Sequence, residues 1–132
     1  MGRRNPVYIV DEDPSARCGL ARLLRTSGHE AREFATAEEF LDALDRELPG
    51  CVVLTAGLPG LSCEALQDRL GPHGAQLPII VVSAVDDLVS RRRAREIGAA
   101  GFFRKPVDGP ALVDAVDWAL MSNNADDRNG EG

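Results

Sequence analysis

The chain has 132 residues, of which 44% are hydrophobic and 27% charged, with a formal net charge of -6 at pH 7. This size and composition predict one globular domain that needs no disulfides, and the odd set of three cysteines without CxxC spacing predicts reduced thiols. No apolar run approaches the roughly 20 residues of a membrane helix, and the acidic balance disfavours nucleic acid, so we expect a cytoplasmic domain that binds neither membrane nor nucleic acid directly.

Apolar stretches of strand length alternate with stretches of helical periodicity along the chain. The first half predicts strands at 6–10, 30–35 and 51–55, and helices at 14–28 and 36–48. Asp13 followed by Pro14 is typical of a helix N-cap and first position, and Thr36 with Glu39 predicts a capping box. The second of these strands is polar enough for a sheet edge, whereas the third is apolar on both faces, as in a central parallel strand.

The second half continues the alternation. It predicts helices at 62–70, 86–98 and 109–121, and strands at 78–83 and 100–103. The residues after Met121 are polar and aperiodic, so we expect a domain over 1–121 and a flexible polar tail or truncated linker over 122–132. Strands that alternate with helices in this way predict an α/β fold with a doubly wound, five-stranded parallel sheet.

Polar side chains follow four of the predicted strands. They are Asp11, Glu12, Asp13, Thr55, Ser83 and Lys105. Ligands of a doubly wound sheet bind beyond the carboxyl ends of its strands, so we expect these side chains to converge. Carboxylates are ligands for magnesium, and an ammonium and a hydroxyl bind phosphate oxygens, so the pattern favours a site for a hard cation and a phosphoryl group.

Four short motifs occur in order at these strand ends. They are "VDEDPSAR", "LPG", "VVSA" and "FFRKPVD". Over residues 6–121 the chain thereby resembles the receiver domain of two-component response regulators. The resemblance implies a flavodoxin-like (βα)5 fold with strand order 2-1-3-4-5, a role in phosphorelay signal transduction, and a histidine kinase or another signalling protein as partner.

The resemblance also implies roles for the polar residues. Asp11 and Glu12 match the acidic pair that holds magnesium together with a backbone carbonyl, here near Gly57. Ser83 and Lys105 match the hydroxyl and the ammonium that bind the phosphoryl group. The implied site is therefore a phosphate pocket beside a metal.

The resemblance also implies which residues take part in the switch between signalling states. Ser83 and Phe102 match the switch pair, and Pro106 matches the family's cis-proline. Thr55 is the departure, because it occupies the position of the aspartate that accepts the phosphoryl group. A neutral hydroxyl would need a general base to attack phosphorus, which a carboxylate nucleophile does not.

Loss of the acceptor carboxylate has two further consequences. It removes a metal ligand, so we expect magnesium to bind weakly if it binds at all. It also removes an anion beside Lys105, so we expect this ammonium to pair directly with Asp11 or Glu12. The sequence predicts a binding module without a catalytic residue, not an enzyme, which acts by protein-protein contact as an atypical pseudo-receiver.

Alternatives stay open at several positions. Thr55 could merely complete a strand, and Ser83 could be a hydroxyl at the start of a helix. The arginine run 91–95 could be a solvated helix face or a docking surface, and the face of the fourth helix, fifth strand and fifth helix could form a homodimer. A receiver regulated by kinase docking or by phosphorylation elsewhere is an alternative function. A different class is a small α/β domain that binds an anion or nucleotide through Lys105 and Ser83.

Overall fold

The computed structural model describes residues 6–44, 50–55, 78–84, 88–96 and 98–131, with only the backbone described for Leu44 and for 122–131. The predicted helix at 62–70 and the carbonyl near Gly57 lie outside the described residues. Between them the described residues form the strands and helices in chain order: β1 (Val7–Val10), α1 (Pro14–Thr26), β2 (Ala31–Phe34), α2 (Ala37–Leu44), β3 (Cys51–Thr55), β4 (Ile79–Ser83), α4 (Leu88–Glu96), β5 (Gly101–Arg104) and α5 (Gly109–Glu131).

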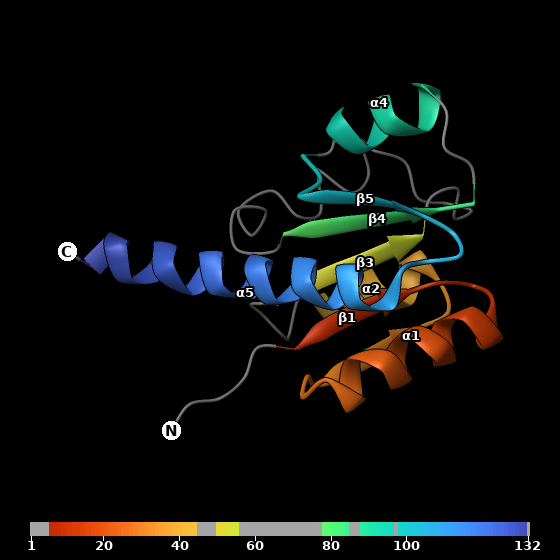
Figure 1. Ribbon diagram of the computed structural model, residues 1–132, viewed down its shortest axis with the longest axis horizontal. Helices are drawn as coiled ribbons and strands as arrows, with labels where there is room; N and C mark the ends of the chain where they lie inside the picture. The colour runs from red at the N-terminus through yellow and green to blue at the C-terminus, as the bar shows by residue number, and fades with distance from the viewer. Residues whose placement is uncertain (1–5, 45–49, 56–77, 85–87, 97, 132) are drawn as a thin grey trace.

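The five strands form one parallel sheet in the order β2-β1-β3-β4-β5 (Figure 1). This confirms the predicted doubly wound sheet and its strand order. The more polar β2 is an edge strand, and β3, whose first four residues are all buried, lies at the centre. All strands run in the same direction, so their carboxyl ends meet at one edge of the sheet.

The ends of the helices follow the local sequence. Asp13 caps α1 by accepting a hydrogen bond from the backbone N–H of Ser15 at 3.0 Å, and Pro14 occupies the first helical position. The Thr36 hydroxyl accepts from the Glu39 backbone N–H at 3.1 Å, and the Glu39 carboxylate accepts in return from the Ala35 N–H at 3.1 Å. The predicted capping box is thus present, with its return bond one residue earlier than in the usual pattern.

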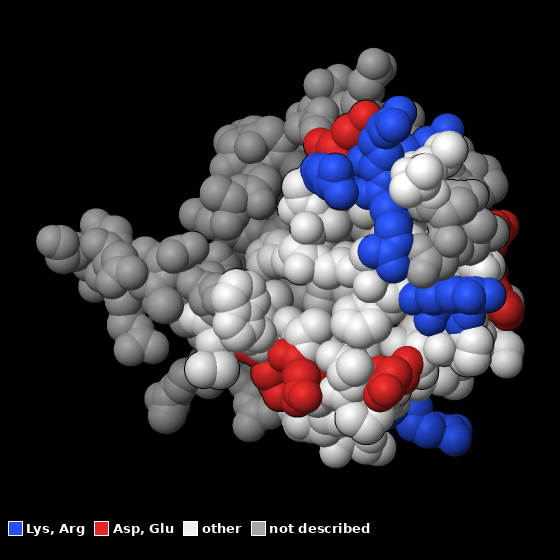
Figure 2. Space-filling model, turned by 45° about the horizontal axis from the view of Figure 1, so that its top comes forward, with Lys and Arg blue, Asp and Glu red and all other residues white. Residues whose placement is uncertain are grey.

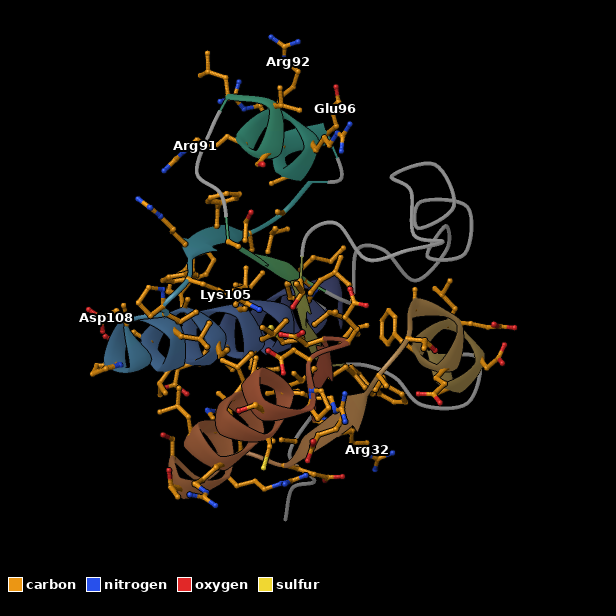
Figure 3. All side chains as sticks on the ribbon, turned by 90° about the vertical axis from the view of Figure 1, so that its right-hand side faces the viewer. Arg32, Arg91, Arg92, Glu96, Lys105 and Asp108 are labelled. Atoms are coloured by element: carbon orange, nitrogen blue, oxygen red, sulfur yellow. The ribbon has the colours of Figure 1, made fainter. Side chains whose placement is uncertain are left out.

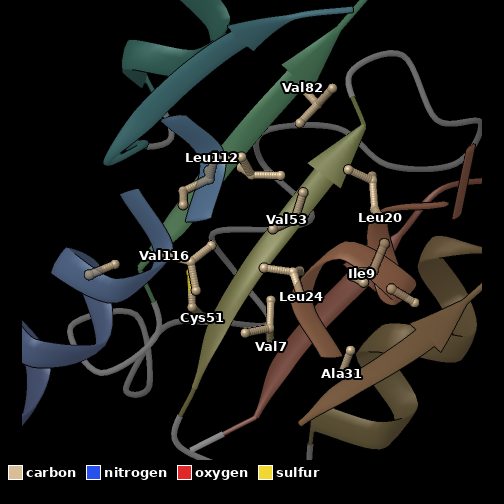
Figure 4. Close-up of a cluster of buried hydrophobic side chains, with 13 residues drawn as sticks. Val7, Ile9, Leu20, Leu24, Ala31, Cys51, Val53, Val82, Leu112 and Val116 are labelled. Atoms are coloured by element: carbon tan, nitrogen blue, oxygen red, sulfur yellow. The ribbon is translucent and has the colours of Figure 1, made fainter. Parts of the chain in front are cut away.

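The hydrophobic core consists of two layers, one on each face of the sheet, because alternate strand residues point to opposite sides. One layer lies under α2 and α4 and includes Tyr8, Phe40 and Ala94. The other lies under α1 and α5, and its members include Val7, Ile9, Leu20, Leu24, Val53, Leu112 and Val116 (Figure 4). In Figure 1 the helices α1 and α5 accordingly lie in front of the sheet and α2 behind it.

Helix α5 is longer than the composition predicts. Its backbone continues to Glu131, ten residues beyond the predicted helix end at Met121. Extension of an existing helix adds one hydrogen bond for each residue fixed, so a polar sequence can continue a helix that packing has already nucleated. The division between domain and tail stays a prediction. Among the described helices, α5 included, there is none that combines the length and the apolar character needed to cross a membrane.

Candidate functional site

The carboxyl edge of the sheet brings together side chains from strands that are distant in the sequence. Asp11 follows β1, Thr55 ends β3 and Lys105 follows β5. The ammonium nitrogen of Lys105 lies 3.0 Å from Oδ2 of Asp11 and forms an ion pair with it. Figure 3 looks onto this edge and shows Lys105 at its centre, between β5 and the helices α1 and α5. The expected direct pairing of Lys105 is confirmed, with Asp11 as its partner.

The Asp11 carboxylate is buried, with 1% of the residue exposed. Burial alone raises the pKa of Asp11, but hydrogen bonds to the ionised form outweigh it and hold the pKa below its ordinary value of 3.8. The strongest of these comes from the Asp13 backbone N–H, which donates to Oδ1 at 2.9 Å. The Lys105 ammonium and the Thr55 hydroxyl add to it. Asp11 is therefore a fully engaged anion at neutral pH.

Ser83 and Lys105 hold the ends of β4 and β5 together. The Lys105 backbone N–H donates to the Ser83 carbonyl at 2.8 Å, and Ser83 is buried with 4% exposed. The Lys105–Pro106 peptide bond is cis, as the resemblance implies. These contacts place the Lys105 backbone beside the end of β4, from which its side chain reaches Asp11.

Arg17 is a neighbour of the site that the sequence pattern did not reveal. Its Nη1 donates to the Asp11 carbonyl at 2.9 Å, and its Nε lies 3.5 Å from the Glu33 carboxylate in β2. Glu33 also pairs with Arg25 at 3.2 Å. These partners meet because α1 packs on β2, and only that packing, not any spacing in the sequence, could have identified them.

The other predicted site residues lie in mixed surroundings. Thr55 is half-buried beside Asp11, whereas Glu12 is exposed. Phe102 is half-buried and packs against the core layer under α4. Gly57 lies outside the described residues. Asp11, Thr55, Ser83 and Lys105 are thus gathered at one edge, and Glu12 borders it from solvent.

As arranged here, these residues do not fit a magnesium ion. Magnesium prefers oxygen ligands with free lone pairs in octahedral geometry. Both carboxylate oxygens of Asp11 already accept hydrogen bonds, and the Lys105 ammonium is one of the donors. In the described part of the chain, no three His, Cys, Asp or Glu side chains are grouped in a way that could hold a metal.

Two helices carry exposed stripes of opposite charge. The basic stripe lies on α4 and consists of Leu88, Arg91, Arg92 and Arg95. The acidic stripe lies on α5 and consists of Asp114, Asp117, Trp118 and Met121. Each follows the spacing i, i+3, i+4, i+7 of a single helix face. Figure 2 shows most basic side chains gathered in the upper part of the view, with an acidic group beside them, and two acidic groups in the lower part across a largely uncharged surface.

Comparison with known proteins supplies a family. The model of the response regulator receiver domain matches residues 7–117. The transcriptional regulatory protein TdiR of Thauera aromatica is 38% identical over 130 residues, covering 97% of this chain and 57% of TdiR. The transcriptional regulatory protein FixJ of Azorhizobium caulinodans is 38% identical over 118 residues, covering 87% of this chain and 54% of FixJ.

A solved structure of the response regulator StyR superposes with a TM-score of 0.83 and 36% identity, covering 98% of this chain and 65% of StyR. The chain thus spans a little over half the length of the curated relatives named above. The match to the receiver-domain model runs through the sheet and through Asp11, Ser83 and Lys105, the same residues that the structure gathers at one edge. The chain therefore belongs to the response regulator receiver domain family.

Proposed function

We propose that this receiver domain does not accept a phosphoryl group at Thr55 and that it signals by protein-protein contact. The observation that carries this proposal is the closed pocket, in which Asp11 is paired with Lys105 at 3.0 Å and hydrogen-bonded by Thr55. A pocket whose charges already satisfy one another has little to gain from binding magnesium and phosphate.

The chemistry at Thr55 supports the first half of the proposal. An alcohol attacks phosphorus efficiently only when a base removes its proton. The neighbouring carboxylate is Asp11, and its lowered pKa makes it a weak base. The Thr55 hydroxyl also donates its proton toward Asp11 as a hydrogen bond that stabilises the anion, which fits a structural role for Thr55.

The pairing of Lys105 supports a state that is independent of metal. A magnesium ion at Asp11 would compete with the Lys105 ammonium at Oδ2, so any binding is expected to be weak. The same engagement weighs against the nucleotide- or anion-binding alternative, because the charge of Lys105 is already paired with Asp11. Glu12 and a carbonyl near Gly57 would complete such a metal site.

The surface supports the second half of the proposal. The basic stripe on α4 and the acidic stripe on α5 are complementary in charge, and each has an apolar end or centre, with Leu88 81% and Trp118 66% exposed. We therefore propose a homodimer through the α4–β5–α5 face, in which the α4 of one copy meets the α5 of the other. Since the relatives TdiR and FixJ are named transcriptional regulatory proteins, we extend to this chain a role in transcriptional control, with a histidine kinase or another signalling protein as its partner.

The test is phosphoryl labelling of the native chain and of the Thr55→Asp variant with acetyl phosphate and magnesium, followed by intact mass measurement. We expect no adduct on the native chain and a magnesium-dependent phosphoryl adduct on the variant, because an aspartate is ionised and nucleophilic at neutral pH. A stoichiometric adduct that maps to Thr55 in the native chain would overturn the proposal. An unlabelled variant would show that other parts of the pocket have also lost their function.

A further inference from the structure

One contact joins the basic stripe on α4 to the edge strand β5. The guanidinium carbon of Arg91 lies 5.0 Å from the centre of the Phe102 ring. This distance is within the roughly 6 Å at which a cation is attracted by the negative face of an aromatic ring. Arg91 is exposed and the ring is half-buried, so the contact lies where solvent-facing surface meets the core.

Phe102 links this surface to the interior. Its backbone pairs with Val81 in the buried strand β4, and its ring packs against the core layer that contains Ala94 of α4. Three residues further along the chain is Lys105, whose backbone is held by Ser83 and whose ammonium pairs with Asp11. A displacement of Phe102 would therefore act on the strand that delivers Lys105 to the pocket.

We propose that Arg91 is a positioning residue, whose guanidinium holds the Phe102 ring in place and so couples the exposed face of α4 to the strand that ends at Lys105. A carboxylate of an acidic partner competes for the same guanidinium and draws it from the ring. The inference rests on the proposed function for the existence of such a partner, but the contact between Arg91 and Phe102 does not depend on it.

Arg92 provides a matched control. It is the next residue of α4, is equally charged and exposed, and points away from the body of the protein, whereas Arg91 leaves the helix on a different side (Figure 3). Replacing either arginine by glutamine removes the same charge from the same stripe. Only replacement of Arg91 removes the cation from the Phe102 ring.

The contact can be tested by fluorine NMR of protein that carries 4-fluorophenylalanine. The sequence has four phenylalanines, and the Phe102→Leu variant identifies the Phe102 signal by its loss. At low protein concentration, we expect Arg91→Gln to shift the Phe102 signal, Arg91→Lys to return it part of the way, and Arg92→Gln to leave it unchanged. A variant whose fold is generally disturbed would instead show shifts of several phenylalanine signals together. Equal effects of Arg91→Gln and Arg92→Gln, or no shift with either, would overturn the proposal.

The coupling to an acidic partner is tested by adding hexaglutamate at low salt to the native chain. We expect a saturable shift of the Phe102 signal that persists in Arg92→Gln and is lost in Arg91→Gln. An unchanged Phe102 signal in the native chain, or an equal shift in Arg91→Gln, would contradict the coupling. These spectra are recorded on unphosphorylated protein, whereas phosphoryl labelling of Thr55 would refute the proposed function in a separate experiment, so the two failures are distinguishable.

Discussion

The carboxyl edge of the sheet and the α4–α5 surface both contain opposite charges, but they arrange them differently. At the edge, the buried Asp11 accepts hydrogen bonds from the Asp13 backbone and from Lys105 within one pocket. On the surface, the basic and acidic stripes lie on separate helices, each largely exposed to solvent. The charges at the edge are paired inside the molecule, whereas the two stripes face solvent, although Asp117 also contacts His29 and Arg91 the Phe102 ring.

This difference bears on the proposal that Thr55 stands in place of an acceptor aspartate while the fold is kept. With Thr55 in place of a third acid, the pocket contains fewer like charges and the remaining carboxylate is stabilised by Lys105. Under the proposed function, phosphoryl acceptance is lost while the ion pair between Asp11 and Lys105 is present. The proposed homodimer surface does not depend on that chemistry.

We expect the largest effect on stability from removing the Lys105 cation at the edge of the sheet. We expect Lys105→Met to lower the free energy of unfolding by about 3 kcal/mol at pH 7, because it leaves the buried Asp11 carboxylate without its counter-ion. Urea denaturation followed by circular dichroism measures the loss. Arg104→Met, which removes an exposed cation from the preceding residue, should change stability by less than about 0.5 kcal/mol. Similar losses in the two variants would show that the pair is not buried as described.

Removing the Asp11 carboxylate should lower the free energy of unfolding less than removing the Lys105 ammonium. We expect Asp11→Asn to lower stability by about 1 to 2 kcal/mol at pH 7, because the Lys105 side chain is 27% exposed and can be solvated once it loses its partner. Asparagine also keeps an oxygen for the Asp13 N–H. The same urea denaturation measures this smaller loss, and a variant less stable than Lys105→Met would contradict the assigned burial of the two groups.

The native chain and Asp11→Asn should also differ in how their stability changes with pH. The folded-state pKa of Asp11 lies below 3.8, so the carboxylate contributes its full stability above that ordinary value and loses it as the pH falls through the lower folded pKa. The stability difference between the native chain and Asp11→Asn should therefore be constant from neutral pH to about pH 5 and shrink in more acidic solution. Urea denaturation across this pH range measures it. A difference that grows with acid would mean that the pKa of Asp11 is raised.

Substitutions in the two stripes should change self-association and leave the free energy of unfolding almost unchanged. We expect Trp118→Ala or Arg92→Glu to weaken self-association at least several-fold, while the free energy of unfolding changes by less than about 0.5 kcal/mol. Sedimentation velocity over a range of concentrations measures the association. Restoring it by combining Arg92→Glu with Asp114→Arg would support direct contact between the stripes. A native chain that is monomeric throughout would remove the homodimer from the proposal.

The sequence predicted the features that depend on local patterns. The strands, the cap at Asp13, the capping box at Thr36, and the edge at which Asp11 and Lys105 meet follow from periodicity and from the rules of parallel sheets. The strand order was implied by the family resemblance. The resemblance also implied the cis peptide bond before Pro106.

Contacts that depend on tertiary packing were not predictable in this way. His29 lies 2.7 Å from Asp117 of α5, and Arg17 reaches both Asp11 and Glu33. These pairs are set by how α1 and α5 lie on the sheet, which neither spacing nor propensity specifies. The choice of Asp11 over Glu12 as partner of Lys105 likewise required the buried position of the first and the exposure of the second.

The central claim is that the pocket is already closed without metal or phosphate. Its most direct test is a titration of the native chain with magnesium and then beryllofluoride, followed by NMR of the backbone amides of Asp13 and Lys105. The account predicts no saturable shift of either amide in the native chain and a saturable shift of both in the Thr55→Asp variant. A saturable, one-to-one response of the native chain would contradict the account.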